Sequence, residues 1–189
     1  MKGHLHIPTL IIIFLCCYHP AAAWSNDSCS DDLANPSYSI PDINQLNEEE
    51  TLRVGAFNIQ VFGKTKASKP EVMDVLGKII RTYDVVAIQE IRDKSQTALP
   101  ALVDVVNSDN PQYDYVVSER LGRTTSKEQY AYVYNNHSVE LTGIHTYPEP
   151  NGTDPFHRDP YIASFRVLDG NFDITFITIH TDPAGCGRG

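Results

Sequence analysis

Polar side chains stand at the ends of four apolar segments in this chain. They are Asn58, Glu90, Glu128 and His180. Each follows or caps an apolar run, so the pattern predicts that they meet at one rim of one β-sheet. Asparagine and glutamate oxygens suit a hard cation such as Mg²⁺. A histidine beside a carboxylate suits proton transfer, because the carboxylate fixes the imidazole tautomer and stabilises the imidazolium.

Glu90 is the most informative of these residues. The strand predicted over Val85–Ile88 continues through Gln89 into Glu90, without the Gly, Asn or Asp that usually ends a buried strand. A carboxylate held by a strand end can serve as a metal ligand or as an acid/base group. A solvated or salt-bridged glutamate is the plain alternative for Glu90 alone, so the interpretation depends on its companions.

Two arginines, Arg92 and Arg158, add the charge that a phosphate group requires. Guanidinium groups bind phosphate oxygens in a fork, and with the four rim residues they indicate metal-assisted phosphodiester hydrolysis. Each of these six residues also has an ordinary interpretation, as a turn residue, a surface charge or a satisfied core histidine. Spacing alone therefore leads only as far as a candidate hydrolase.

The elements that must position these residues begin near Thr51. A strand is expected from there to Asn58, followed by a loop around Gly63–Lys66. Ser68-Lys69-Pro70-Glu71 has the pattern of a helix start, with a capping serine and an early proline. The apolar residues that follow recur on one helical face. They are Val72, Val75, Leu76, Ile79 and Ile80. The next strand, Asp84–Glu90, is apolar on both faces, which predicts a buried position in the sheet.

A second helix is expected over Lys94–Asn107, where Pro100 must lie in the first turn or cause a kink. Its predicted core residues are Leu99, Leu102, Val103 and Val106. Several later segments alternate at period two, as strands do. The predicted strands are Tyr113–Val117, Tyr130–Tyr134, Val139–Thr146, Tyr161–Leu168 and Phe172–His180. The order β-α-β-α followed by strands predicts a mixed α/β fold.

The first 23 residues have the order of a secretory signal peptide. Lys2 precedes the apolar run Leu10–Cys17, and small residues lead to Ala23. The run is too short to span a bilayer comfortably, so we expect cleavage after Ala23 and secretion, with an uncleaved anchor as the alternative. No other stretch of the sequence is long and apolar enough to cross a membrane.

Glycosylation motifs and cysteines fit a secreted glycoprotein. Three sequons begin at Asn26, Asn136 and Asn151. Cys29 and Cys186 would remain after cleavage, and the sequence leaves open whether they pair with each other.

Charge is unevenly distributed along the chain, whose formal net charge is −9. Residues 24–50 carry seven of the 24 acidic residues and no Lys or Arg, which predicts an acidic flexible linker. The rest is only mildly acidic. That balance argues against a protein that holds DNA through a large basic face, but an enzyme needs only a few local arginines.

Several segments resemble the deoxyribonuclease I family of the endonuclease/exonuclease/phosphatase superfamily. They are Ala56–Gly63, Tyr83–Asp93, Tyr115–Arg123, Lys127–Tyr130, Phe156–Pro160 and Ile179–His180. The first two occur broadly in the superfamily. Leu121-Gly122-Arg123 followed by Lys127-Glu128 narrows the resemblance to the deoxyribonuclease I branch, and the similarity extends from about Thr51 to Pro183.

The resemblance implies roles for the rim residues. Glu90 would be the principal Mg²⁺ ligand with support from Asn58, and Mn²⁺ could substitute for Mg²⁺. Glu128 would orient His180, and the two would form one acid/base pair beside the scissile phosphate of double-stranded DNA.

Further contacts are implied by the same resemblance. Arg92 and Arg158 would contact DNA from the minor-groove side. Asp154, the backbone of Phe156 and Asp159 resemble a structural Ca²⁺ loop, although Asp159 is shorter than the glutamate usual there.

This chain also departs from the family pattern. Gln60 stands where many relatives carry an arginine, which removes one phosphate contact. Ser126 replaces an aromatic residue that packs against a sugar, so stacking in the minor groove should weaken. The small Cys-x-x-Cys loop before the Ca²⁺ segment is absent from the sequence.

The family fold is a four-layer α/β sandwich of two related sheets, and its C-terminal half contains a second His–Asp pair and an Asp-x-Asn metal segment. This chain ends at Gly189, and Cys186–Gly189 does not resemble that continuation. We therefore expect residues 51–183 to form the N-terminal part of the domain, with the C-terminal half missing and residues 184–189 as an atypical tail. An inner sheet face left open would be broadly apolar, which predicts aggregation or oligomerisation and weak or absent DNA cleavage.

Three functions stay open from the sequence. The first is a secreted, divalent-metal-dependent endodeoxyribonuclease. The second is another phosphodiesterase of the superfamily, acting on a lipid or a nucleotide, and the third is a non-catalytic binding fragment. Actin binding cannot be inferred from the residues.

Overall fold

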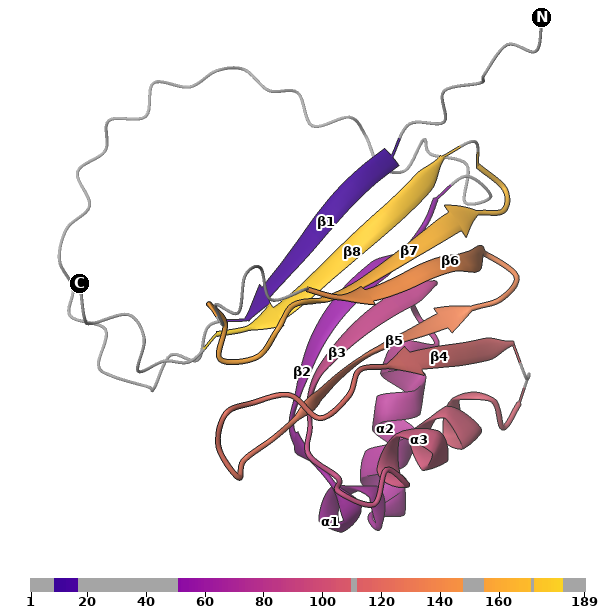
Figure 1. Ribbon diagram of the computed structural model, residues 1–189. Coiled ribbons are helices and arrows are strands. Elements are labelled where there is room, and N and C mark those ends of the chain that lie inside the picture. The colour runs from indigo at the N-terminus through magenta and orange to yellow at the C-terminus, as the bar shows by residue number, and fades with distance from the viewer. Residues whose placement is uncertain (1–8, 17–50, 110–111, 148–154, 171, 182–189) are drawn as a thin grey trace, which may run out of the picture.

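Two four-stranded β-sheets lie face to face in the computed structural model (Figure 1). It describes residues 9–16, 51–109, 112–147, 155–170 and 172–181. The first sheet, in the order β2-β3-β5-β4, consists of β2 (Val54–Phe62), β3 (Val85–Ile91), β5 (Gln129–Asn135) and β4 (Tyr113–Val117). The second sheet, in the order β1-β8-β7-β6, consists of β1 (Thr9–Cys16), β8 (Asp173–His180), β7 (Tyr161–Val167) and β6 (Val139–Thr146). The pairs β2–β3 and β1–β8 are parallel, and the other neighbouring strands are antiparallel.

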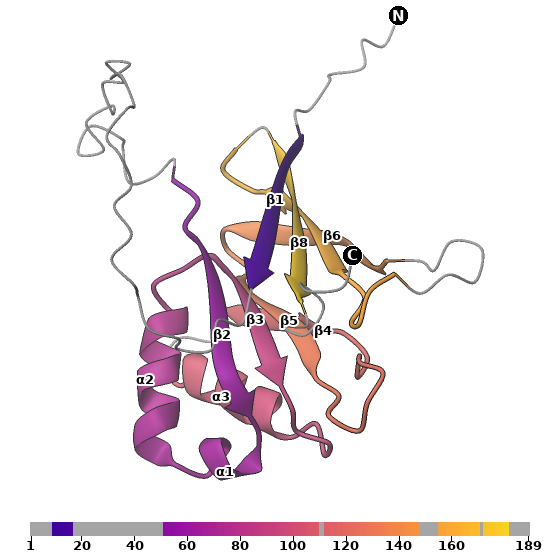
Figure 2. The same ribbon diagram turned by 90° about the vertical axis from the view of Figure 1, so that its left-hand side faces the viewer.

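Three helices cover the face of the first sheet that is turned away from the second sheet (Figures 1 and 2). They are α1 (Lys64–Ala67), α2 (Pro70–Ile80) and α3 (Ala98–Val106). The described residues thus form three layers, of helices, first sheet and second sheet. The predicted α/β sandwich is confirmed by this arrangement.

Strand β3 lies at the centre of the packing, and all seven of its residues are buried. Alternate side chains point to opposite faces of a strand. Val86 and Ile88 therefore join the apolar cluster beneath the helices, whereas Val85 and Ala87 join the cluster between the sheets. This two-sided burial agrees with the continuous apolar run that the sequence shows.

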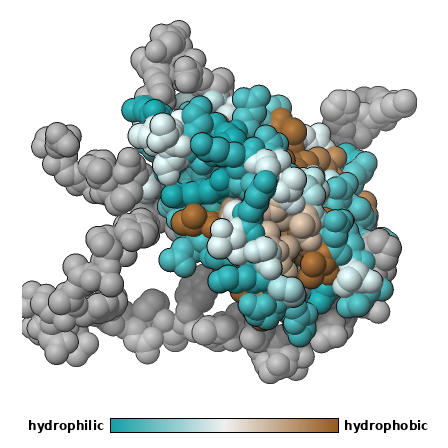
Figure 3. Space-filling view, turned by 90° about the horizontal axis from the view of Figure 1, so that it is seen from below, coloured by the Kyte–Doolittle hydropathy of each residue, from teal (hydrophilic) through white to brown (hydrophobic). Residues whose placement is uncertain are grey.

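The expectation of an open inner sheet face is wrong for the described residues. Aromatic rings from both sheets fill the space between them: the Tyr132 ring lies 5.7 Å from that of Tyr161, 6.3 Å from that of Phe165 and 6.1 Å from that of Phe176 between centroids. The second sheet covers the face because β6, β7 and β8 turn their own apolar residues toward it. Seen from below, on the helix side, the described surface is mainly hydrophilic with separate apolar patches (Figure 3).

The start of α2 differs from the prediction. Ser68 does not cap this helix, because its hydroxyl donates to the carbonyl of Thr65 in the short helix α1, which replaces the expected loop. Pro70 is the first helical residue. The buried face is also rotated: Met73 is buried, whereas Val75, predicted as a core residue, is 54% exposed.

The start of α3 also differs, since the helix begins at Ala98 rather than Lys94. The carboxylate of Asp93 accepts hydrogen bonds from the backbone N–H groups of Ser95, Thr97 and Ala98, which holds the intervening residues outside the helix. Pro100 lies in the first turn, as expected, and the four predicted core residues are all buried.

The segment predicted as the apolar core of a signal peptide is paired in this structure as the edge strand β1, in parallel register with β8 (Figure 2). A short apolar run rich in isoleucine is compatible with both states, so removal of the signal stays a prediction. The predicted linker at 24–50 lies outside the described residues, as do Cys29, Cys186, Asn26 and Asn151. Asn136 lies exposed in the turn between β5 and β6. Within the described ranges, no helix is long and apolar enough to cross a membrane.

Candidate active site

Irregularities in β2 and β3 place Asn58 and Glu90 beside each other. Three residues of β2, 59–61, lie opposite one residue of β3, because Asn58 pairs with Gln89 and the next pair is Phe62 with Ile91. A second irregularity lets two residues of β3, 89–90, lie opposite one residue of β5. β-Bulges of this kind re-aim side chains and are frequent next to active sites.

The bulges carry unusual backbone conformations. Gln60, Val61 and Glu90 have φ values of 50°, 54° and 63°. Non-glycine residues rarely adopt these values, least of all a β-branched valine. Such conformations persist only where surrounding contacts hold them, and they concentrate at functional sites.

Both carboxylate oxygens of Glu90 accept hydrogen bonds from the β2 bulge. The Asn58 amide donates to Oε1 at 3.0 Å and the Val61 N–H donates to Oε2 at 2.9 Å. Burial opposes ionisation of Glu90, but these donors and the nearby charges of His180 and Arg92 lower its pKa below the ordinary value. Glu90 therefore presents an ionised carboxylate of fixed orientation.

Glu128 and His180 form a second, buried pair. Glu128 precedes β5 and is 0% exposed, and its Oε1 lies 2.6 Å from His180 Nδ1 and 2.7 Å from Arg158 Nε. Arg92 Nε lies 3.5 Å from the other carboxylate oxygen. The two guanidinium groups predicted to contact DNA thus also compensate the charge of Glu128.

His180 faces the first sheet because of the alternation along β8. Ile174, Phe176, Thr178 and His180 are the buried residues of that strand. The His180 N–H donates to the Tyr130 hydroxyl at 2.8 Å. Gln89 donates to the Thr178 hydroxyl and the Ile179 carbonyl, which joins the strand of Glu90 to the strand of His180.

The remaining ring nitrogen of His180 points toward Glu90. Nε2 lies 3.7 Å from Glu90 Oε1 and makes no hydrogen bond within the part of the chain that the structure describes. It faces a hollow of about 370 Å³. The hollow is lined by Gln60, Val61, Glu90, Arg92, Arg158, His180 and Thr181. Four of the six predicted rim and arginine residues line this hollow, while Asn58 and Glu128 contact them from behind.

The side chains around the hollow supply only some of the ligands that a divalent cation needs. The described ranges contain no group of three or more His, Cys, Asp or Glu side chains placed to hold a metal. Mg²⁺ requires no such group, since it keeps several waters and binds through one or two carboxylates and substrate phosphates. The ionised Glu90 meets that requirement, whereas the Asn58 amide oxygen accepts a hydrogen bond from Gln60 N–H at 2.9 Å.

The predicted Ca²⁺ loop is described only in part. Asp154 lies outside the described residues. The carbonyl of Phe156 accepts a hydrogen bond from Arg123 at 2.9 Å. Calcium binding at Asp154, Phe156 and Asp159 therefore stays a prediction.

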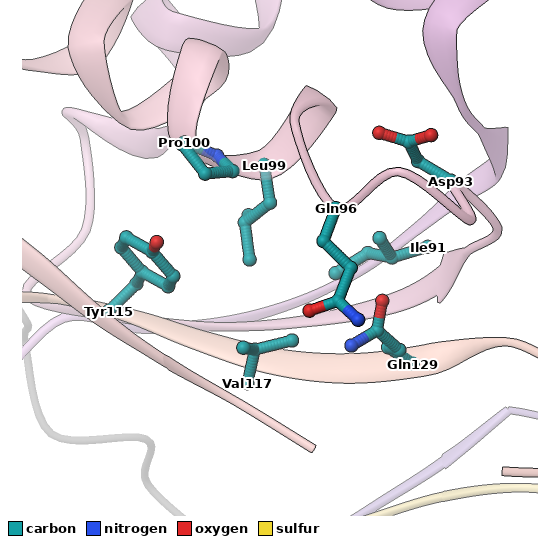
Figure 4. Close-up of a pocket in the computed structure, with 8 residues that line it drawn as sticks. All are labelled: Ile91, Asp93, Gln96, Leu99, Pro100, Tyr115, Val117 and Gln129. Carbon is teal, nitrogen blue, oxygen red and sulfur yellow. The ribbon is translucent and has the colours of Figure 1, made fainter. Parts of the chain in front are cut away.

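A second cavity, of about 50 Å³, lies between α3 and the first sheet (Figure 4). It is lined by Ile91, Asp93, Gln96, Leu99, Pro100, Tyr115, Val117 and Gln129. None of the predicted site residues lines it, and the hydrogen bonds of Asp93 are directed to its own loop. The larger hollow is therefore the candidate active site.

Several residues around the site were not identified from the sequence. In the sequence, Tyr130 and Gln89 belong to apolar segments predicted as strands, and Lys66 belongs to a segment predicted as a loop. Their contacts depend on which strands and bulges lie beside them. Of these three residues, only Tyr130 could have been identified from the sequence, because it stands two residues after Glu128.

Comparison with known proteins gives a family match and several similar deoxyribonucleases. A model of the Endonuclease/Exonuclease/phosphatase family matches residues 55–178. Deoxyribonuclease-1 of Mus musculus is 43% identical over 127 residues, covering 65% of this chain and 45% of that protein. Deoxyribonuclease-1 of Homo sapiens is 42% identical over 119 residues, covering 61% of this chain and 42% of that protein. The chain thus spans less than half the length of these curated relatives.

A solved structure gives the same fold. A mannosyl-6-phosphatase from Bacteroides thetaiotaomicron superimposes with a TM-score of 0.51 at 16% identity, over 72% of this chain and 54% of its own. At this identity the likeness concerns the arrangement of the elements.

Proposed function

Because this chain belongs to the endonuclease/exonuclease/phosphatase family, we propose that it hydrolyses phosphodiester bonds of double-stranded DNA with the help of a divalent metal ion. The observation that carries the proposal is the buried Glu128–His180 pair, in which Glu128 Oε1 lies 2.6 Å from His180 Nδ1. Its outward nitrogen faces a hollow that also contains a carboxylate and two guanidinium groups. The similarity to proteins named deoxyribonuclease-1 supports DNA as the substrate.

Proton transfer is the task of His180. With Nδ1 donating to Glu128, neutral imidazole leaves Nε2 as an acceptor. Nε2 can take a proton from a water molecule that attacks the phosphorus, while the P–O bond to the departing sugar oxygen breaks and that oxygen takes up a proton from solvent. The Glu128 carboxylate then stabilises the imidazolium, which is the usual function of such a pair.

Glu90 is the residue that would hold the metal ion, and Asn58 orients its carboxylate. A bound Mg²⁺, or Mn²⁺ in its place, supplies positive charge that stabilises the developing charge on the phosphate oxygens. The hydrogen bonds from Asn58 and Val61 fix the carboxylate before the metal arrives. This fixed geometry reduces the reorganisation that catalysis requires.

Arg92 and Arg158 would bind the phosphate oxygens. Both line the hollow. Each guanidinium has five N–H donors, more than its contacts with Glu128 use. The same groups would thus compensate the charge of Glu128 and attract the polyanionic substrate.

Secretion, glycosylation and a Ca²⁺ requirement complete the proposal. They are supported by the signal-like N-terminus, by the exposed sequon at Asn136 and by the family resemblance.

A supercoiled-plasmid assay tests the function, since a single nick relaxes a whole molecule. We expect nicking that requires Mg²⁺ or Mn²⁺ and stops with EDTA. His180→Ala should lower the rate by roughly 10²–10⁴, the usual contribution of a general acid or base. His145→Ala, at an exposed histidine of β6, is the matched control and should cleave like the unaltered chain.

Three outcomes of the same assay would contradict the proposed function. Equal rates for the unaltered protein and His180→Ala would exclude the proposed base. Hydrolysis of a lipid or nucleotide diester without nicking of DNA would redirect the substrate to another phosphodiesterase class. DNA binding without cleavage in any variant would favour the binding function.

A further inference from the structure

The side chain of Lys66 contacts the backbone of the β2 bulge. Its ammonium group donates to the carbonyl of Ile59 at 2.9 Å and to the carbonyl of Gln60 at 2.5 Å. Lys66 belongs to the short helix α1 and is half-buried. It does not line the hollow. The ammonium is therefore used within the protein, at the two residues that begin the bulge.

The bulge requires such a contact because its conformation is unfavourable. Gln60 and Val61 both have φ values near 50°, at 50° and 54°, in a region that non-glycine residues seldom occupy. The side chains of these two residues contribute little packing, since both are exposed. Charge-assisted hydrogen bonds to two successive carbonyls are stronger than neutral ones and can hold the backbone in place.

The bulge in turn determines how Glu90 is held. The Val61 N–H donates to Glu90 Oε2, and the Gln60 N–H donates to the Asn58 oxygen. The Asn58 amide group then donates to Glu90 Oε1. A relaxation of residues 59–61 toward ordinary strand geometry would therefore loosen both carboxylate oxygens together.

We propose that Lys66 is a positioning residue for Glu90: its ammonium fixes the β2 bulge, and the bulge fixes the carboxylate for a divalent cation. The cation rests on the proposed function, whereas the fixing of the bulge does not. Partners that orient a metal ligand typically contribute 10–100-fold to metal affinity. Lys66 belongs to this class although it touches neither the metal nor the substrate.

Three variants test the proposal, each measured for Mn²⁺ affinity by electron paramagnetic resonance and for hydrogen exchange of the Val61 amide by NMR. Lys66→Met should weaken Mn²⁺ binding roughly 10-fold and accelerate exchange at Val61. Lys66→Arg should recover much of both, because a guanidinium also donates to two carbonyls. Lys78→Met removes an equal charge from an exposed position on α2 and should behave like the unaltered chain.

The direction of the change in Mn²⁺ affinity distinguishes a positioning role of Lys66 from a purely electrostatic effect of its charge. If Lys66 acted only as a nearby positive charge, its removal would strengthen Mn²⁺ binding. Stronger or unchanged binding in Lys66→Met, or unchanged exchange at Val61, would overturn the proposal. If the unaltered chain and Glu90→Gln bind Mn²⁺ equally, the metal site of the proposed function fails, and Val61 exchange still decides whether Lys66 holds the bulge.

Discussion

Glu128 illustrates how single residues sustain this site. A carboxylate with no exposed surface is stable only when charges and hydrogen bonds compensate it. Arg158 and His180 contact the same oxygen, and Arg92 approaches the other. The charge that makes His180 a useful base is therefore also the charge that holds the two arginines beside the hollow.

Asp93 has a structural function close to the site. Its carboxylate receives hydrogen bonds from the Ser95 hydroxyl and from three backbone N–H groups, at Ser95, Thr97 and Ala98. Burial opposes its ionisation, but these donors outweigh burial and bring its pKa well below the ordinary value. Asp93 thus fixes the turn that leads from the segment of Glu90 and Arg92 to the start of α3.

We expect Asp93→Asn to lower the free energy of unfolding at pH 7 by about 1–2 kcal/mol. A folded pKa below the unfolded value of about 3.9 gives stability that is present above that pH and is lost as the pH falls. The difference between the two proteins should therefore shrink below about pH 4. Urea unfolding at several pH values measures it, with Asp74→Asn on the exposed face of α2 as control. A difference that stays constant from pH 7 to pH 3 would contradict this account.

At the scale of elements, β8 must be held at a fixed height against β3 and β5. Gln89 of β3 bonds to Thr178 and to the Ile179 carbonyl, and the Tyr130 hydroxyl of β5 accepts the N–H of His180. Burial raises the pKa of Tyr130, so its hydroxyl stays neutral. These bonds set the position of His180 relative to Glu90 and Glu128.

Tyr130→Phe should leave the buried His180 N–H without its acceptor and lower the free energy of unfolding by about 1–3 kcal/mol. It should also lower the rate of DNA nicking, because the imidazole moves with its backbone. Tyr134→Phe on the same strand and face is the matched control, and its stability and rate should change little. Equal effects of the two substitutions in urea unfolding and plasmid assays would show that the hydroxyl of Tyr130 does not position β8.

At the scale of the whole molecule, the site exists only while the two sheets stay packed. Glu90 lies in the first sheet, Glu128 directly precedes β5 of that sheet, and His180 lies in the second sheet. The aromatic cluster between the sheets includes Phe165, whose ring lies 5.1 Å from that of Tyr134 and 5.8 Å from that of Phe176 between centroids. Packing at a distance from the hollow thus controls the geometry of the acid/base pair.

Phe165→Ala should lower the free energy of unfolding by about 3–5 kcal/mol through lost burial and a cavity. Leu168→Ala, at a side chain that is 46% exposed, should change it far less. Circular dichroism during thermal unfolding measures both. If the two sheets form one cooperative unit, the Phe165→Ala transition will shift as a single step; two separate steps would show that the sheets unfold independently.

The sequence determined the local features of this protein because they depend on neighbouring residues. The alternation in β8 gave the strand and the inward face of His180, and the apolar run before Glu90 gave the buried strand. The motifs around these residues indicated the deoxyribonuclease I branch of the endonuclease/exonuclease/phosphatase family, and the match over residues 55–178 confirms membership of that family. The prediction also named all the residues of the hollow that carry charge.

Tertiary structure decided the features that depend on distant partners. The capping pattern at Ser68 failed because its hydroxyl found a nearer carbonyl, and Val75 is exposed because α2 settled on the sheet through Met73. The two bulges, the Lys66 contact and the Tyr130 contact arise only when β2, β3, β5 and β8 lie side by side. A sequence specifies side chains and local periods, but the register between strands, and with it the exact geometry of Glu90 and His180, is a property of the packed sheets.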